Sequence, residues 1–167
     1  MKAFTSLKDI PYADVFDVAK KTTNPEIIFQ IVNRQGDPSY SSSIAANNQA
    51  KGETTNSLKP NNGVGGNVKA DLVKEYESTD LRKDFSIKYA NDATVKDWYI
   101  TKFRDVSSTA GANGFGGNDW PLIRYADVIL MLAEAKLMKG QNADTEINMI
   151  RHRAGLTDLS GATLTDL

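Results

Sequence analysis

The side chains able to do acid–base chemistry are scattered along the chain. Asp80 with Asp84 and Asp92 with Asp97 are carboxylate pairs that lie close together in the sequence. Two carboxylates hydrolyse a glycosidic bond only when both face one cleft, and nothing in the sequence directs either pair toward one. Serine and threonine are common, but they lie in low-complexity loops without a positioned histidine base. We therefore expect a protein that binds its ligand without catalysis.

Metal, cofactor and nucleic-acid sites are not expected either. The sequence contains one histidine, His152, which we expect on a plain helix surface, and no cysteine, so it offers no credible zinc site. The glycine-rich stretch 107–119 lacks the Lys-Ser/Thr pair of a phosphate-binding loop. With 20 basic and 21 acidic side chains and a net charge of −1, the balance of charge argues against nucleic acid as the main partner.

The candidate binding residues lie in a long polar loop over residues 33–67, which is rich in Ser, Asn and Gly. A loop of this length in a compact domain is usually functional or disordered. A pyranose ring has apolar C–H faces and polar edges, so an aromatic side chain provides a platform while amides and charged groups bind the hydroxyls. Tyr40 is the best candidate platform, with Arg34, Asn47 and Asn48 as nearby hydrogen-bonding groups.

Each aromatic side chain also has a structural alternative. Tyr40 serves equally well to pin its loop to the body of the protein. Trp98 is a second candidate platform, although a tryptophan in a strand more often belongs to the core. Phe115 is flanked by glycines, which favours an anchor for the loop over a ligand contact. Trp120 precedes the strongest helical pattern, and we expect it to pack.

That helical pattern predicts a hairpin of two helices over residues 121–155. The first helix begins at Pro121, which suits the first helical position, and ends at Gly140. The second is capped by Asn142 and ends at Gly155. The first helix is apolar almost all round, so we expect neighbours to bury it. Charged residues interrupt it, so we do not expect it to span a membrane.

Charged residues along the hairpin predict an ionic seam. Arg124, Asp127 and Glu134 share one helix face, because their spacings are those of successive helical turns. Arg151 and Arg153 lie near the end of the second helix, where positive charge is favoured. We expect one of these arginines to pair with Asp127 or Glu134.

The rest of the sequence predicts short elements and two flexible loops within a single unit, 1–167. The predicted loops are residues 33–67 and 107–119. The predicted elements are helices over 11–21 and 68–77, and strands over 26–32, 85–90 and 98–103, the last two joined by a turn near Asn91 and Asp92.

Residues 120–156 read WPLIRYADVILMLAEAKLMKGQNADTEINMIRHRAGL, and they resemble the motif of the SusD/RagB family of outer-membrane nutrient-binding lipoproteins. The match is long, ordered and in register. Upstream, residues 24–29 (NPEIIF) are similar to a strand of the family. Further similar pieces are 71–73, 80–82 and 102–103.

The resemblance implies a mainly α, SusD-like fold with tetratricopeptide-like helical hairpins, a loop-rich region and a few short strands. It implies a protein on the extracellular face of the outer membrane that captures a polysaccharide or oligosaccharide, or less often a peptide. The ligand is then passed to a SusC-type TonB-dependent porin. Two alternatives remain open, a helical-repeat scaffold that binds only protein and a surface glycoside hydrolase.

Family members normally begin with a signal peptide and a lipid-bearing cysteine. The first residues, MKAFT, lack an apolar signal region, and the chain has no cysteine. We therefore expect a fragment covering roughly the C-terminal half of a member. Its only membrane attachment would be an N-terminal lipid anchor that is missing here.

Overall fold

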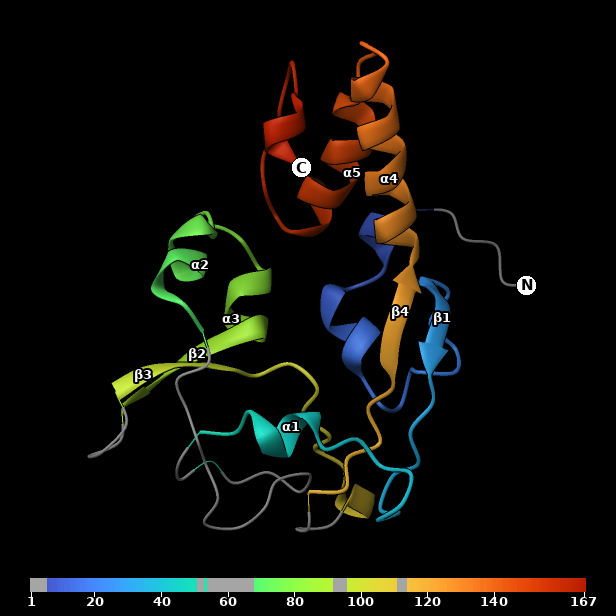
Figure 1. Ribbon diagram of the computed structural model, residues 1–167, viewed down its shortest axis with the longest axis vertical. Coiled ribbons are helices and arrows are strands. Elements are labelled where there is room, and N and C mark those ends of the chain that lie inside the picture. Colours follow the sequence, from blue (N-terminus) through green and yellow to red (C-terminus); the bar gives the residue numbers. More distant parts are fainter. Residues whose placement is uncertain (1–5, 51–52, 54–67, 92–95, 111–113) are drawn as a thin grey trace.

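The computed structural model describes residues 6–50, 53, 68–91, 96–110 and 114–167. Figure 1 shows short helices and strands joined by long connections. The α-helices are α1 (Ile44–Asn47), α2 (Ala70–Glu75), α3 (Arg82–Ser86), α4 (Tyr125–Met138) and α5 (Asp144–Arg153). The strands are β1 (Ile27–Ile31), β2 (Ile87–Asn91), β3 (Lys96–Ile100) and β4 (Trp120–Arg124). Short 3-10 helices cover Leu7–Asp9, Tyr12–Phe16, Ser108–Ala110 and Leu164–Asp166.

Helices α4 and α5 lie side by side at one end of the molecule (Figure 1). Their contact is built on Ala133, Ala143 and Ile147, and the two alanines are fully buried. Small side chains allow the helices to approach closely, and Leu137 and Leu159 pack around the contact. No helix in the described part of the chain combines the length and apolar character that a membrane crossing requires.

Glycines end both helices, as the sequence predicted. Gly140 (φ 67°) and Gly155 (φ 77°) adopt the left-handed conformation that glycine reaches without a Cβ penalty. After α4, the Gly140 N–H donates to Leu137 O (2.9 Å) and the next N–H reaches back to Lys136 O (2.9 Å). These paired bonds form a Schellman motif, which satisfies the last carbonyls of the helix. The same pattern follows α5.

The predicted helix start at Pro121 is wrong, because residues 120–124 form β4. This strand pairs antiparallel with β1, and Pro121 faces Gln30. A two-stranded ladder has only edge strands, so it tolerates a residue without an N–H donor. Helix α4 begins after Arg124, whose N–H donates to the Asp127 carboxylate (2.8 Å). That bond caps the first turn, four residues later than predicted.

At the start of α5, Asn142 Oδ1 accepts the Asp144 N–H (3.0 Å), although the N-cap residue is Ala143.

The predicted helix over 11–21 is also wrong. Only Tyr12–Phe16 is helical, as a 3-10 helix, and turns follow it. The Asp17 carboxylate accepts the Ala19 N–H (2.9 Å). Such a local side-chain bond competes with helical hydrogen bonds and favours a turn.

Aromatic rings form the core in the middle of the chain. Phe16 contacts Tyr12, Phe85 and Phe103 with ring centroids 5.3, 5.7 and 5.0 Å away. Trp120 stacks on Phe103 at 5.2 Å, so its predicted packing role is confirmed. Phe103 is buried and has φ 61°, an unusual backbone conformation for a bulky residue. The rings on both sides of it hold it there.

The two predicted loops are partly ordered against each other. Gly36 N donates to Phe115 O (2.9 Å), and Ser42 exchanges backbone hydrogen bonds with Gly116. The first loop also contains α1, which the sequence did not predict. The remaining residues of these loops, 51–52, 54–67 and 111–113, lie outside the described residues, as does Asp92 of the predicted turn.

Candidate functional site

The family-like motif residues form a buried ionic network. Glu26, fully buried before β1, accepts a hydrogen bond from Arg124 (3.0 Å) and another from Arg153. The Glu26 carbonyl also accepts the Tyr125 N–H (2.9 Å). Burial lowers the pKa of Arg153 from its ordinary value, and Glu26 opposes that shift. The network joins β1, the start of α4 and the end of α5, so we assign these residues an architectural role.

The predicted pairing of Arg151 or Arg153 with Asp127 or Glu134 is therefore wrong. Arg151 instead donates to Glu77 (2.9 Å), which follows α2, and to a backbone carbonyl after α5. Asp127 is occupied within its own helix turn by Arg124 (3.4 Å). The arginines reach segments far away in the sequence, which a pattern confined to the hairpin does not reveal. His152 is exposed and contacts Asp158.

The backbones of Arg34 and Tyr40 meet across a short turn over residues 34–40, which we call the Tyr40 turn. The Arg34 N–H donates to the Tyr40 carbonyl (2.7 Å), and the Arg34 guanidinium lies 3.7 Å from Asp37. The Tyr40 side chain does not pin the turn to the body, because the residue is 68% exposed. The turn therefore carries both an exposed ring and an exposed cation.

Buried polar side chains hold this turn against residues 105–119 through hydrogen bonds. The Asp105 carboxylate, 1% exposed, accepts the Gln35 side-chain amide (2.6 Å) and the Gly117 N–H (2.8 Å). Asp119 accepts Lys21 (2.9 Å) beside it. A Cβ on Gly117 would lie 2.7 Å from the Gln35 Cβ, so the two segments approach as closely as glycine allows. These contacts fix the base of the turn.

The other predicted site residues lie elsewhere or are engaged locally. Asn47 and Asn48 donate their amides within α1, at 3.3 and 2.9 Å. Trp98 is half-buried in β3, edge-to-face with Tyr89 at 5.5 Å, and the Lys83 ammonium stands over its ring at 5.8 Å. Figure 1 shows β3 and the turn that follows β1 in separate regions of the molecule. Trp98 therefore does not share a site with the Tyr40 turn.

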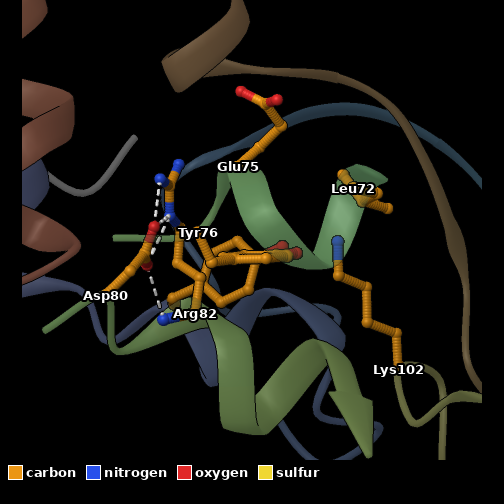
Figure 2. A pocket seen from close by; sticks show the side chains of 7 residues that line it. Leu72, Glu75, Tyr76, Asp80, Arg82 and Lys102 are labelled. Carbon is orange, nitrogen blue, oxygen red and sulfur yellow. Dashed lines mark hydrogen bonds and ion pairs between the residues drawn. The ribbon is translucent and has the colours of Figure 1, made fainter. Parts of the chain in front are cut away.

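A pocket of about 290 Å³ lies between α2 and the turn after β3. This size is at the lower end of the range for small-ligand sites, about 300–1,000 Å³. Its lining combines rings, an apolar side chain and charges of both signs (Figure 2). The lining residues are Tyr12, Leu72, Glu75, Tyr76, Asp80, Arg82 and Lys102.

One wall of the pocket is a fixed ion pair. Arg82 donates to the Asp80 carboxylate from Nε (2.9 Å) and Nη2 (2.6 Å), and its backbone N–H donates as well (2.9 Å). Burial acts to raise the pKa of Asp80, but the side-chain and backbone bonds from Arg82 together hold it below its ordinary value. Asp80 is therefore an ionised acceptor that positions Arg82.

The opposite wall carries Lys102. Its ammonium stands 5.3 Å from the centre of the Tyr12 ring and 5.2 Å from that of Phe16. Within the described part of the chain, neither Lys102 nor Glu75 has a partner of opposite charge. Figure 2 shows the Glu75 carboxylate at the rim, directed away from Lys102.

Sequence reasoning missed this pocket because its residues are distributed from Tyr12 to Lys102. No periodic pattern connects positions so far apart. Residues 80–82 and 102–103 were noted only as similar to family segments, and that similarity is the one signal that pointed here.

Comparisons with known proteins agree with the fold. The SusD family model matches residues 33–166. "Surface glycan-binding protein A from Bacteroides uniformis" aligns with a TM-score of 0.77 and 21% identity, over 99% of this chain and 37% of that chain. "B. fragilis NanU" aligns with a TM-score of 0.66 and 30% identity, over 92% and 36%.

A third similar structure is "Surface glycan-binding protein A from Bacteroides thetaiotaomicron in complex with laminarihexaose". Its TM-score is 0.70 and its identity 17%, over 99% of this chain and 42% of that chain. The chain thus spans 36–42% of the length of these three structures. Curated protein sequences gave no match.

Proposed function

The chain belongs to the SusD family, and from this premise we propose that it takes part in binding a glycan on the outer face of the outer membrane. The printed names of two similar structures describe surface glycan-binding proteins, and one of these holds laminarihexaose. The observation that carries the proposal for this chain is the pocket between α2 and the turn after β3. We call it the α2 pocket.

The lining of the α2 pocket suits a sugar ring. Tyr76 offers an aromatic ring for the C–H surface of a pyranose, and Tyr12, whose ring carries Lys102, lines the same pocket. Arg82 is oriented by Asp80, and its Nη1 has no partner within the described residues, so it can donate to a hydroxyl. Fixed donors and rigid rings lose little conformational entropy on binding, which favours affinity.

The carboxylates of the α2 pocket support binding without hydrolysis. A glycosidase needs a protonated carboxyl group as its general acid, usually one whose pKa is raised. The pKa of Asp80 is shifted the other way, and its oxygens are taken by Arg82. Glu75 lines the pocket at its rim, with its carboxylate directed away from Lys102 (Figure 2). Neither residue is placed to protonate a leaving group.

The Tyr40 turn is proposed as a second contact for a longer glycan. It carries an exposed ring and Arg34, and the Gln35–Asp105 hydrogen bond holds the turn in place, as a sugar platform requires. It lies apart from the α2 pocket in Figure 1, so we expect the two to contribute separately.

Affinity electrophoresis of this chain against a panel of soluble polysaccharides and peptides tests the proposal. We expect retardation by at least one polysaccharide. Tyr76→Ala should weaken it about tenfold, equivalent to about 1.4 kcal/mol. Tyr89→Ala is the matched control, because Tyr89 is half-exposed on β2 and lines no part of the α2 pocket. Retardation by peptides alone would favour the peptide-binding alternative, and retardation by nothing would reject the proposal.

We also propose that exposed apolar side chains at β1 and on α4 contact protein, in keeping with hand-off to a SusC-type TonB-dependent transporter. Phe29 and Val32 are 57% and 69% exposed, and Met131 on α4 is 55% exposed. Large apolar side chains left exposed in this way are found at protein contacts. Co-purification of the transporter should be lost in Phe29→Asp and kept in Tyr76→Ala. Equal recovery with both variants would reject this contact.

A further inference from the structure

Resting on the proposed glycan-binding function, we infer that the α2 pocket selects a sugar unit that carries an anionic group, and that Lys102 binds this group. The argument concerns which of the four charges lining the pocket remain available to a ligand. Two are acidic and two are basic.

Three of these charges are committed or turned away. Asp80 and Arg82 neutralise each other through three side-chain contacts of 2.6–3.2 Å. Glu75 is exposed at the rim and directs its carboxylate away from Lys102 in Figure 2. Lys102 and Glu75 both lack a counter-charge in the described part of the chain, but Glu75 is exposed at the rim, so Lys102 is the unpaired charge held against the rings of the pocket wall. The interior therefore favours a negative ligand group.

Lys102 is also held in place. Its ammonium stands over the faces of Tyr12 and Phe16, and a cation in this position is attracted without being neutralised. Its carbonyl accepts a hydrogen bond from Arg104 (3.2 Å), and the next residue, Phe103, is locked in the aromatic core. The positive charge is thus fixed at the pocket wall and has lost part of its hydration, which strengthens its attraction for an anion.

The far wall defines the rest of the ligand. Arg82 is oriented by Asp80 on the side opposite Lys102 (Figure 2), and the Tyr76 ring belongs to the same pocket. A group bound here needs an anion at one end, hydroxyls at the other and an apolar face between them. A uronic acid unit and a sulfated sugar both have this chemistry, whereas a neutral sugar leaves Lys102 without a partner.

Binding of this chain to matched polysaccharides tests the inference. The probes are polygalacturonate and hyaluronan as carboxylated chains, dextran sulfate as a sulfated chain, and dextran and laminarin as neutral chains. We expect the carboxylated or the sulfated probes to bind at least about tenfold more tightly than the neutral ones. The preferred class identifies the anion, and added salt should weaken the binding.

Lys102→Met should remove about tenfold of the affinity for the anionic probe and most of its salt dependence, since methionine keeps the apolar stem over the rings. Lys102→Arg should retain the preference. Lys83→Met is the matched control, because Lys83 also stands over an aromatic ring but lies outside the α2 pocket. Circular dichroism confirms that each variant is folded.

The outcomes separate the two proposals. Tight binding of a neutral probe that depends on Tyr76 but not on Lys102 overturns the anionic selectivity and keeps glycan binding. Equal losses in Lys102→Met and Lys83→Met reduce the effect to net charge and also overturn it. Binding to no probe at all, neutral or anionic, overturns the glycan-binding function itself.

Discussion

Replacing Glu26 by glutamine should destabilise the protein more than any exposed charge change. Glu26 is 0% exposed and holds two arginines, of which the Arg153 side chain is 5% exposed. The amide keeps the size of the carboxylate but removes its charge, and leaves Arg153 buried without a counter-charge. Removing one partner of a buried pair costs about 3–5 kcal/mol. Arg124 suffers less, because it retains Asp127 at 3.4 Å.

The loss is measured by urea unfolding followed by circular dichroism. With a slope of about 2 kcal/mol/M, a loss of 3–5 kcal/mol lowers the midpoint by about 1.5–2.5 M. Asp71→Asn is the control, because its pair with Lys74 is 73–87% exposed and contributes about 0–1 kcal/mol. A domain of ordinary stability, about 5–15 kcal/mol, should still fold with the Glu26→Gln change.

A third variant separates charge from shape. Replacing Glu26 by leucine and both arginines by methionine removes these three charges at once, and the remaining Asp127 side chain is 40% exposed to solvent. Apolar replacement of a whole buried ion pair is often neutral, so the triple variant should recover most of the lost stability. Equal midpoints for Glu26→Gln and Asp71→Asn would refute the reasoning, since the network would then contribute no more than a surface pair.

Two further predictions concern single positions. Gly140→Ala should lower the free energy of unfolding by about 1–2 kcal/mol through its left-handed backbone alone, because nothing lies within 4 Å of the added Cβ. Gly155→Ala places that Cβ 2.9 Å from Leu81 Cγ and should cost about 1–3 kcal/mol more. Thermal unfolding measures both costs, and equal costs would contradict the predicted clash. The pKa of Asp80 is lowered in the folded protein, so its stabilising contribution is complete above its unfolded pKa, about 3.9, and disappears as pH falls through the lower folded value. The difference in unfolding free energy between wild type and Asp80→Asn should therefore stay constant above about pH 5 and shrink below about pH 4. A difference that does not change between pH 6 and pH 3 would show that Asp80 gains nothing from Arg82.

Sequence patterns predicted features that depend on neighbouring residues. The ends of α4 and α5 followed from single glycines, because only glycine adopts the left-handed conformation there without penalty. Strand β1 and the presence of β2 and β3 followed from local apolar and β-branched runs. The family motif was visible for the same reason, since it lies within one continuous stretch.

Features built from distant residues were missed. Residues 120–124 carry an apolar pattern that suits either a helix or a strand, and the choice was made by pairing with β1. The partners of Arg151 and Arg153 lie 74 and 127 residues away, so helix spacing alone predicted the wrong carboxylates.

The candidate site shows the same division. Arg34 and Tyr40 were predicted together because a short turn joins them. Lys102 and Tyr76 were not predicted, because only the folded chain places the turn after β3 beside α2. Trp98 was considered a second candidate platform on the basis of residue type, and its strand lies apart from the Tyr40 turn.

Amide hydrogen exchange of this chain, with and without its tightest-binding polysaccharide, tests the central claim most directly. If the glycan occupies the α2 pocket, exchange should slow in α2 and in residues 101–104, and the effect should disappear in Tyr76→Ala. Slowed exchange confined to residues 34–48, or no change anywhere at saturation, would contradict the assignment of the glycan to the α2 pocket.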